Sequence, residues 1–384
     1  MICIKNAKVV LPKEIIDDGI VLVDGEKIVY AGHKDSIEIP EDAEFFDADG
    51  LYVGPGFIDI HVHGGNENAF GVKNNTEIVE FHLSHGTTTI FPTFYMTMSE
   101  DEMASSIKNI QNLMENGGIG NAIGGIYMEG PFMNVNYGCD TSSCMWPSGE
   151  IKKEHFKNLV DTAKDTVKIW AIAPEREGIE DFVRYAKQVN PKVHFAVGHS
   201  EATPEQIQPL KKYDMNISTH ITNAKSSKSA WLGTRGCGPD EDCLYDDSTY
   251  AEMICDSEGV HVNPFLQKLI VKIKGDDKII LITDSSPNTD PLPEGFEHMT
   301  DLAFDKDRNL AGSRLTMDRS CRNFMKHTNS DIRKTFLAAS SNPSKALGIY
   351  DVIGSVEAEK KANLVIVDDT FDVKKVMLQG EFIK

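Results

Sequence analysis

The sequence predicts a (β/α)8 barrel joined to a small β-sandwich domain that both ends of the chain build together. Through the middle of the 384 residues, short apolar runs alternate with helical patterns. At the two ends, apolar and polar residues alternate with a period of two, which is typical of antiparallel strands. A barrel of this kind takes about 250 residues, and more with insertions. We therefore expect the barrel over residues 55–354, and the small domain from residues 1–54 together with 355–384.

The small domain is predicted from strand and turn signals at each end. Apolar residues alternate from Val21 to Gly32, and Gly25 interrupts them as a turn. At the C-terminal end, Asn363–Val367 reads as a strand and Val373–Ile383 as a hairpin around Gly380. Because this pattern is absent between the two ends, we expect the terminal strands to assemble with one another.

The barrel is predicted from eight apolar runs. In chain order they are Gly56–Ile60, Thr87–Phe91, Ala122–Met128, Val167–Ile172, Val193–Val197, Met215–Ser218, Ala251–Ile254 and Ile279–Ile282. Helical patterns separate several of them, at Ser99–Asn116, Glu150–Lys164, Gly178–Val189 and Thr203–Lys212. Two segments, 134–148 and 225–247, fit neither pattern and are expected to be long loops. Loops that follow barrel strands commonly carry specificity.

Composition limits the partners and the location. The chain carries 39 Lys and Arg against 59 Asp and Glu, a formal net charge of −20. Nucleic acids and anionic membranes attract clustered cations, so we expect neither as a partner. The first residues do not resemble a signal peptide, and no apolar run approaches the roughly 20 residues of a membrane span. Seven cysteines, an odd number, do not indicate a disulfide framework. We expect a cytoplasmic protein.

The strongest chemical signal is the pair His61 and His63, at the end of the first apolar run. Alternate residues of a strand point to the same side, so both imidazoles would project into the mouth of the barrel. Two imidazoles so placed can bind one metal ion. On the pair alone, two hydrogen-bonded histidines beside a loop would explain the pattern equally well.

Four further apolar runs also end in a residue of the ligand type. These residues are Glu129, His199, His220 and Asp284. Because the strand ends of a barrel meet on one face, the pattern predicts two ions that share Glu129. His61 and His63 would bind one ion, and His199 and His220 the other. Histidine and carboxylate ligands suit zinc, iron(II) or manganese, and the sequence does not choose among these metals.

The motifs that contain these residues follow one another in a particular order. They are HxH at His61, MEGPF at Met128–Phe132, GHS at His199, THxxNA at Thr219–Ala224, TDS at Thr283–Ser285 and LAGSRLTMD at Leu310–Asp318. In this order they resemble the amidohydrolase superfamily, and within it the N-acetylglucosamine-6-phosphate deacetylase family. The resemblance extends over nearly the whole chain.

The resemblance implies metal-dependent hydrolysis of the acetamide of an N-acetylated amino-sugar phosphate, such as N-acetylglucosamine 6-phosphate. Asp284 would be the general base and acid, taking a proton from water and giving it to the departing amine. His261 would orient or polarise the acetamide, and Asn223 with the backbone of Ala224 would help to hold the sugar phosphate. The resemblance also favours a homodimer in which a loop of one subunit reaches the site of the other.

The number of ions stays open. Some members of the family lack the HxH pair and use one ion, which here would be held by Glu129, His199 and His220. Both histidines of the pair are present in this chain, so a two-ion site is the alternative.

The sequence departs from the family on the side of the substrate. After THxxNA the family has an arginine that binds phosphate in a short segment, whereas this segment is longer here. Arg235 is the candidate replacement, and with Lys225 and Lys228 it forms a compact cationic segment. A solvated loop would also explain these charges. The residues therefore specify the reaction more closely than they specify the sugar or its phosphorylation.

Three other functions fit parts of the pattern. A related N-acetyl sugar, of the galactosamine type or without phosphate, would be the substrate of a similar deacetylase. A cyclic amidase or N-acyl amino acid hydrolase would use the same scaffold, but such relatives often place a carboxylated lysine between the metals, where this chain has Glu129. A non-catalytic assembly protein would typically have lost ligands that are all present here.

Overall fold

The computed structural model describes residues 1–71, 73–139, 141–227, 229, 231–287, 291–305 and 307–383. Its larger part is a barrel of eight parallel strands, in the order in which they follow along the chain. They are β6 (Phe57–Val62), β9 (Thr87–Tyr95), β10 (Ile126–Glu129), β11 (Val167–Ile172), β12 (His194–Val197), β13 (Met215–Ser218), β14 (Tyr250–Ile254) and β15 (Ile279–Ile282). All eight predicted strands are present, and the predicted barrel is confirmed.

The first and last strands of the barrel meet through bonds at the mouth. The backbone N–H of Asp284 donates to the carbonyl of His61 at 2.9 Å. Just below, the Thr283 hydroxyl donates to the buried carboxylate of Asp59 at 2.6 Å. These two bonds hold the end of β15 against β6, which places the last and first candidate ligands side by side.

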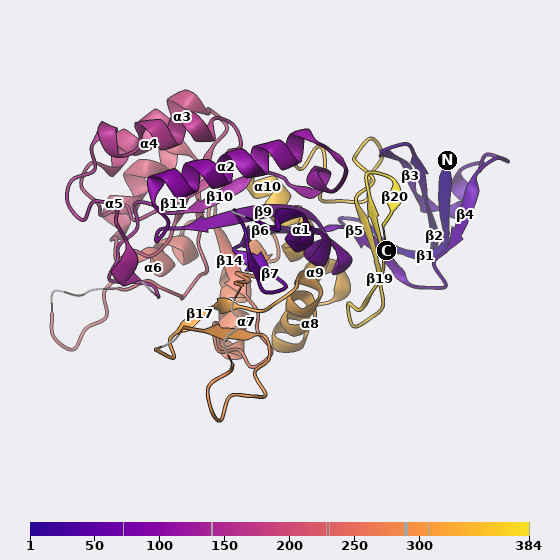
Figure 1. Ribbon diagram of the computed structural model, residues 1–384. Helices are drawn as coiled ribbons and strands as arrows, with labels where there is room; N and C mark the ends of the chain where they lie inside the picture. The colour runs from indigo at the N-terminus through magenta and orange to yellow at the C-terminus, as the bar shows by residue number, and fades with distance from the viewer. Residues whose placement is uncertain are drawn as a thin grey trace.

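Helices cover the outside of the barrel (Figure 1). They are α1 (Asn75–Ser84), α2 (Glu100–Glu115), α3 (Lys157–Ala163), α4 (Ile179–Val189), α5 (Pro204–Ile207), α6 (Pro239–Tyr245), α7 (Pro264–Lys274) and α8 (Met317–Thr328), followed by α9 (Ile332–Phe336) and α10 (Asn342–Ala346). The start of α2 is fixed by a capping box between Ser99 and Glu102. None of the helices among the described residues combines the length and the hydropathy needed to cross a bilayer.

One of the two segments expected to be loops contains a helix. Within 225–247, α6 begins at Pro239, and Asp240, Glu241 and Asp242 occupy its first turn. Proline is favoured at the first position of a helix, and acidic residues in the first turn are stabilised by the helix dipole. The segment is too short to show an apolar period, which is why its periodicity gives no sign of a helix.

The two ends of the chain form a separate sheet, as predicted. Its strands are β1 (Ile2–Val10), β2 (Ile15–Asp24), β3 (Lys27–His33), β4 (Glu44–Asp47), β5 (Tyr52–Pro55), β18 (Leu364–Val367), β19 (Val373–Leu378) and β20 (Glu381–Phe382). Antiparallel pairing of β18 with β5 joins the two ends of the chain. Figure 1 shows both termini on this sheet, on the far side from the helices α3 to α6.

The terminal sheet and the barrel meet at closely packed glycines. Gly54 lies in β5, and a Cβ atom added there would come within 2.4 Å of the Phe336 ring. Beside it, the hydroxyl of Ser340 donates to the carbonyls of Pro55 and Gly56 at 3.3 and 3.1 Å. The absence of a side chain at Gly54 therefore allows α9 to pack directly on the sheet.

This packing can be tested with Gly54→Ala. The added methyl group would push into the buried Phe336 ring, and overpacking of this kind costs about 1–3 kcal/mol of stability. Gly149→Ala is the matched control, because no atom lies within 4 Å of its added Cβ. Chemical denaturation should show a lower free energy of unfolding for Gly54→Ala than for the control. Equal values for the two variants would contradict the packing described here.

Candidate metal centre

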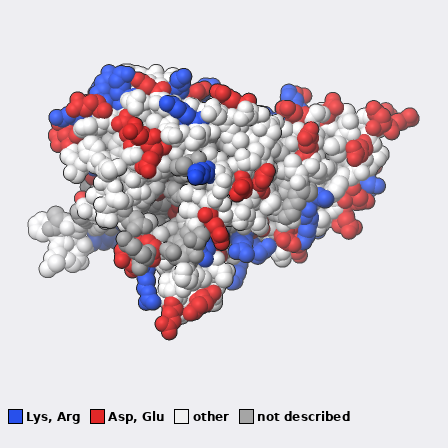
Figure 2. Space-filling model, in the orientation of Figure 1, with Lys and Arg blue, Asp and Glu red and all other residues white. Residues whose placement is uncertain are grey.

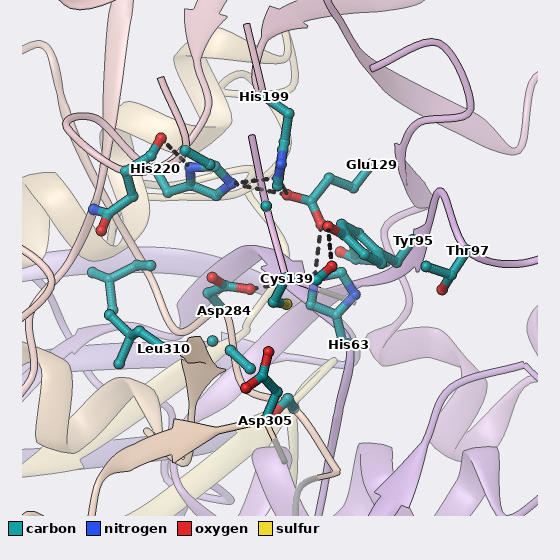
Figure 3. Close-up of a pocket in the computed structure, with 18 of the residues that line it drawn as sticks. His63, Tyr95, Thr97, Glu129, Cys139, His199, His220, Asp284, Asp305 and Leu310 are labelled. Atoms are coloured by element: carbon teal, nitrogen blue, oxygen red, sulfur yellow. Dashed lines mark hydrogen bonds and ion pairs between the residues drawn. The ribbon is translucent and has the colours of Figure 1, made fainter. Parts of the chain in front are cut away.

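The six predicted ligand residues lie together at the C-terminal ends of five barrel strands. His61 lies in β6 and His63 follows that strand directly, whereas Glu129 is the last residue of β10. The remaining three residues each follow a strand by two positions and have positive φ angles, namely His199 (45°), His220 (23°) and Asp284 (49°). Such backbone conformations are costly for residues other than glycine and often occur at functional sites. Figure 3 shows the labelled members of the group facing one another.

Glu129 stands between two groups of ligand atoms. Its Oε1 lies 2.8 Å from Nε2 of His199 and 2.8 Å from Nε2 of His220. Its Oε2 lies 3.0 Å from Nε2 of His63 and 3.6 Å from Nε2 of His61. Each oxygen of this one carboxylate therefore lies close to a different pair of imidazoles.

Asp284 completes the group that contains the HxH pair. Its Oδ1 lies 3.3 Å from Nε2 of His63 and 3.6 Å from Nε2 of His61. Within each of the two groups, His61–His63–Asp284 and Glu129–His199–His220, the ligand atoms all lie within 4.8 Å of one another.

The hydrogen bonds around the second group show which nitrogen atoms carry protons. Nδ1 of His199 faces the Tyr137 carbonyl at 2.6 Å, and Nδ1 of His220 faces the Asn223 carbonyl at 3.2 Å. A carbonyl only accepts, so both Nδ1 atoms donate, and a neutral imidazole then has a lone pair on Nε2. These lone pairs point at a carboxylate oxygen of Glu129. An acceptor nitrogen and a carboxylate oxygen at this distance repel each other unless a proton or a metal cation lies between them, so the donor set fits a metal cation.

Two acidic groups in this centre are held ionised. Burial alone would raise the pKa of Glu129, but His61 and His199 hold that pKa well below its ordinary value. Burial would likewise raise the pKa of Asp284, and His63 and His61 lower it. Both carboxylates are therefore available as anions, Glu129 as a ligand and Asp284 as a proton acceptor.

Sequence reasoning missed Glu252, a buried carboxylate beneath the centre. Its Oε2 lies 3.2 Å from Nδ1 of His61 and accepts the backbone N–H of His220 at 3.2 Å. A carboxylate on the far nitrogen of a ligating histidine fixes the tautomer and the orientation of the ring. Glu252 supports both groups at once, because it bonds one residue from each. It lies within β14, and no pattern in a single sequence distinguishes it from other strand residues.

A cavity of about 850 Å³ opens above the two groups. Its lining includes His63, Glu129, His199, His220 and Asp284 together with Asn223, Ala224, His261, Tyr95, Cys139 and Asp305. The hairpin of β16 (Leu302–Phe304) and β17 (Leu310–Ser313) forms one side of it. The structure thus brings the expected substrate residues Asn223, Ala224 and His261 to the same cavity as five of the six candidate ligand residues, and His61 lies directly beside them.

His261 presents a free nitrogen at this cavity. Its Nδ1 lies 3.1 Å from Oδ2 of Asp256, so this nitrogen donates and the ring is oriented. Its Nε2 is buried and has no hydrogen-bond partner among the described residues. Asn223 lies beside it and donates to the carbonyl of His261 at 3.1 Å. A buried polar atom without a partner is rare and indicates a place for a ligand.

Two expected substrate residues lie elsewhere. The side chain of Lys225 is only 1% exposed, and its Nζ donates to Ser218 and lies 3.3 Å from Asp240. It is a buried structural lysine, contrary to expectation, because the barrel wall supplies its partners. Arg235 is exposed and pairs with Glu241. No Lys or Arg occurs among the described residues that line the cavity, and Lys228 lies outside the described residues.

Several curated proteins that are similar to this chain are deacetylases of amino-sugar phosphates. The N-acetylglucosamine-6-phosphate deacetylase of Bacillus subtilis is 28% identical, over 98% of this chain and 96% of its own length. The N-acetylgalactosamine-6-phosphate deacetylase of Escherichia coli O157:H7 is 27% identical, over 85% of this chain and 86% of its own length.

Solved structures support the fold. N-acetylglucosamine-6-phosphate deacetylase from Pasteurella multocida superposes with a TM-score of 0.85 at 24% identity, over 99% of each chain. A mutant of the enzyme from Mycobacterium smegmatis, in complex with N-acetyl-D-glucosamine-6-phosphate, gives a TM-score of 0.81 at 24% identity, over 99% of this chain and 98% of that one. The sequence profile of the Amidohydrolase family matches residues 52–383. The chain belongs to the amidohydrolase family.

Proposed function

We propose that this protein hydrolyses the acetamide of an N-acetylated amino-sugar phosphate, with N-acetylglucosamine 6-phosphate as its main substrate. The products are acetate and glucosamine 6-phosphate. The observation that carries the proposal is the bridging position of Glu129 beside Asp284 at the floor of a cavity. The relative from Bacillus subtilis, which spans nearly the whole chain, is named for this reaction.

The metal ligands in this proposal form two sets. His61, His63 and Asp284 would hold one ion, and Glu129, His199 and His220 would hold the other. A divalent ion at such a centre lowers the pKa of water and polarises a carbonyl oxygen. Zinc, iron(II) and manganese all accept histidine together with carboxylate.

The reaction itself needs one proton carrier, and Asp284 is placed to serve. Its ionised carboxylate takes a proton from the attacking water as the new C–O bond forms at the acetamide carbon. When the C–N bond breaks, the carboxyl group gives this proton to the nitrogen, which leaves as a neutral amine. The free Nε2 of His261 lies on the same cavity and orients the acetamide, while Asn223 and Ala224 form the wall for the sugar.

The phosphate of the proposed substrate requires a cation, and the described lining of the cavity supplies none. Arg235 is 80% exposed, and near it Trp231 and Leu232 are 77% and 106% exposed on a loop that projects from the body of the molecule (Figure 1). The described part of the tip of this loop carries neither acidic nor basic side chains in Figure 2. We propose a homodimer in which this apolar tip is buried and Arg235 approaches the partner's cavity. Such a cation would counter, at the phosphate itself, the repulsion that a chain of net charge −20 exerts on a dianion.

A cytoplasmic location completes the proposal. The seven cysteines are all thiols, and four of them are buried. This is the usual state of cysteines in a reducing compartment.

The direct test of the proposed function is acetate release from N-acetylglucosamine 6-phosphate. Protein stripped of metal and reloaded with zinc, iron(II) or manganese should release acetate, whereas the stripped protein should not. N-acetylgalactosamine 6-phosphate and unphosphorylated N-acetylglucosamine serve as comparison substrates. Preference for the unphosphorylated sugar would agree with the lack of Lys and Arg among the described lining residues, and would overturn the assigned phosphate.

Asp284→Asn should lower kcat by about 10²–10⁴-fold, because an amide cannot carry the proton. The substitution keeps the shape of the side chain and an oxygen for the ion, so most of the metal should remain bound. Parallel measurements of turnover and metal content check both parts. Turnover near that of the unaltered protein would rule out Asp284 as the proton carrier.

Glu129→Gln should weaken metal binding as well as rate. Its amide leaves only one oxygen to face two pairs of imidazoles, and loss of even an outer partner of a ligand costs about 10–100-fold in affinity. Metal content per chain after dialysis against a weak chelator is the measurement. An unchanged content would show that Glu129 is not a ligand.

Arg235→Ala should raise KM for the phosphorylated sugar by about tenfold or more, since a charge-assisted hydrogen bond contributes about 1.5–3 kcal/mol. KM for unphosphorylated N-acetylglucosamine should change little. Arg184→Ala is the control, because Arg184 is also an exposed arginine paired with an acidic residue, Asp181, on α4. Equal effects of Arg235→Ala on both sugars would contradict the assignment to phosphate.

A further inference from the structure

The segment Asn134–Cys139 is a wall of the cavity that also touches a proposed metal ligand. Gly138 and Cys139 line the cavity. The carbonyl of Tyr137 accepts from Nδ1 of His199 at 2.6 Å. The same short segment therefore contacts the imidazole on one side and the space for the substrate on the other.

A carboxylate outside the cavity holds this segment in place. Oε1 of Glu175, beyond the end of β11, accepts from Nδ2 of Asn134 at 2.9 Å and from the backbone N–H of Glu201 at 2.9 Å. Its Oε2 accepts from the hydroxyl of Ser200 at 2.7 Å. Glu175 thus joins the start of the segment to the two residues that follow His199.

Hydrogen bonds of the Asn134 backbone connect Glu175 to the rest of the segment. Its backbone N–H donates to the carbonyl of His199 at 2.9 Å, and its carbonyl accepts from the N–H of Tyr137 at 3.0 Å. The Tyr137 hydroxyl in turn donates to Oε2 of Glu201 at 2.6 Å. One of these bonds closes a turn within the segment, and the other two connect the segment to His199 and to Glu201 close after it.

The segment has little room to move. Gly138 has a φ of +134°, and a Cβ atom added there would lie 2.6 Å from the Tyr95 hydroxyl and 2.7 Å from Nδ1 of His199. The Tyr95 hydroxyl donates to the carbonyl of Cys139 at 3.1 Å. The backbone at Gly138 therefore packs directly against the side chains of Tyr95 and His199. A displacement of Asn134 would change the contacts of the segment with both side chains.

We infer that Glu175 is a positioning residue that sets both the orientation of His199 and the wall of the cavity, and so couples metal affinity to substrate binding. Glu175 is not among the described residues that line the cavity, so it acts through Asn134, Ser200 and Glu201. When the Glu175 carboxylate is removed, the Tyr137 carbonyl moves away from His199 and no longer accepts the proton on Nδ1 of that ring. The lone pair on Nε2 then loses its fixed direction towards Glu129. The inference rests on the proposed function only in taking His199 as a ligand.

The test uses zinc binding to the full-length protein after removal of metal, measured by competition with a chromophoric chelator. Glu175→Ala should bind zinc about 10–100-fold more weakly, the usual cost of losing an outer partner of a metal ligand. Glu175→Gln should recover most of the affinity, because its amide oxygen still accepts from Asn134 and Glu201. Glu177→Ala, on the same turn but exposed, is the matched control and should bind like the unaltered protein.

Asn134→Asp supplies an independent variant in case Glu175→Ala does not fold. It replaces the amide donor by a second carboxylate facing Glu175, and should weaken zinc binding in the same direction. With saturating metal, both variants should raise KM more than they lower kcat, because the cavity wall shifts while Asp284 stays in place.

Unchanged zinc affinity in Glu175→Ala and Asn134→Asp would overturn the inference. So would a loss in Glu177→Ala as large as that in Glu175→Ala. Zinc binding is measured without substrate, so its result is independent of the reaction. Normal zinc binding without acetate release in the unaltered protein would count against the proposed function alone.

Discussion

The centre of this protein depends on one buried anion placed among the Nε2 atoms of four imidazoles. Oε1 of Glu129 faces His199 and His220, and Oε2 faces His63 and His61. Such an arrangement is stable only when positive charge lies within it. The positions of the surrounding groups follow from this requirement: carbonyls and Glu252 fix the outer nitrogens, and Asp284 adds a second anion on the cavity side.

The barrel makes this concentration of charge possible because its strands end on one face. Buried apolar side chains fill the interior below, so that the ligands are carried on rigid backbone and have little freedom to move away from one another. The bond from Asp284 to His61 then closes the ring between the first and last strands. The terminal sheet packs against α9 through Gly54, far from the centre.

The sequence was sufficient to predict the strands and the convergence of the six candidate ligand residues at one end of the barrel, because apolar runs that end in His, Glu or Asp are local patterns. It failed where a residue's role depends on partners that only the fold brings into contact with it. Lys225 was expected at the substrate, but Ser218 and Asp240 draw its ammonium group into the barrel wall. Glu252 and Glu175 were missed for the same reason, since only the fold brings them to His61 and to Asn134. The helix α6 was missed because seven residues show no period.

Anomalous scattering from crystals of the metal-loaded protein tests the central claim most directly. Data collected at the absorption edge of the bound metal should give two peaks at the mouth of the barrel, one beside each carboxylate oxygen of Glu129. His61, His63 and Asp284 should surround one peak, and His199 and His220 the other. A single peak, or peaks that do not contact Glu129, would contradict the bridging role on which this account of the centre is built.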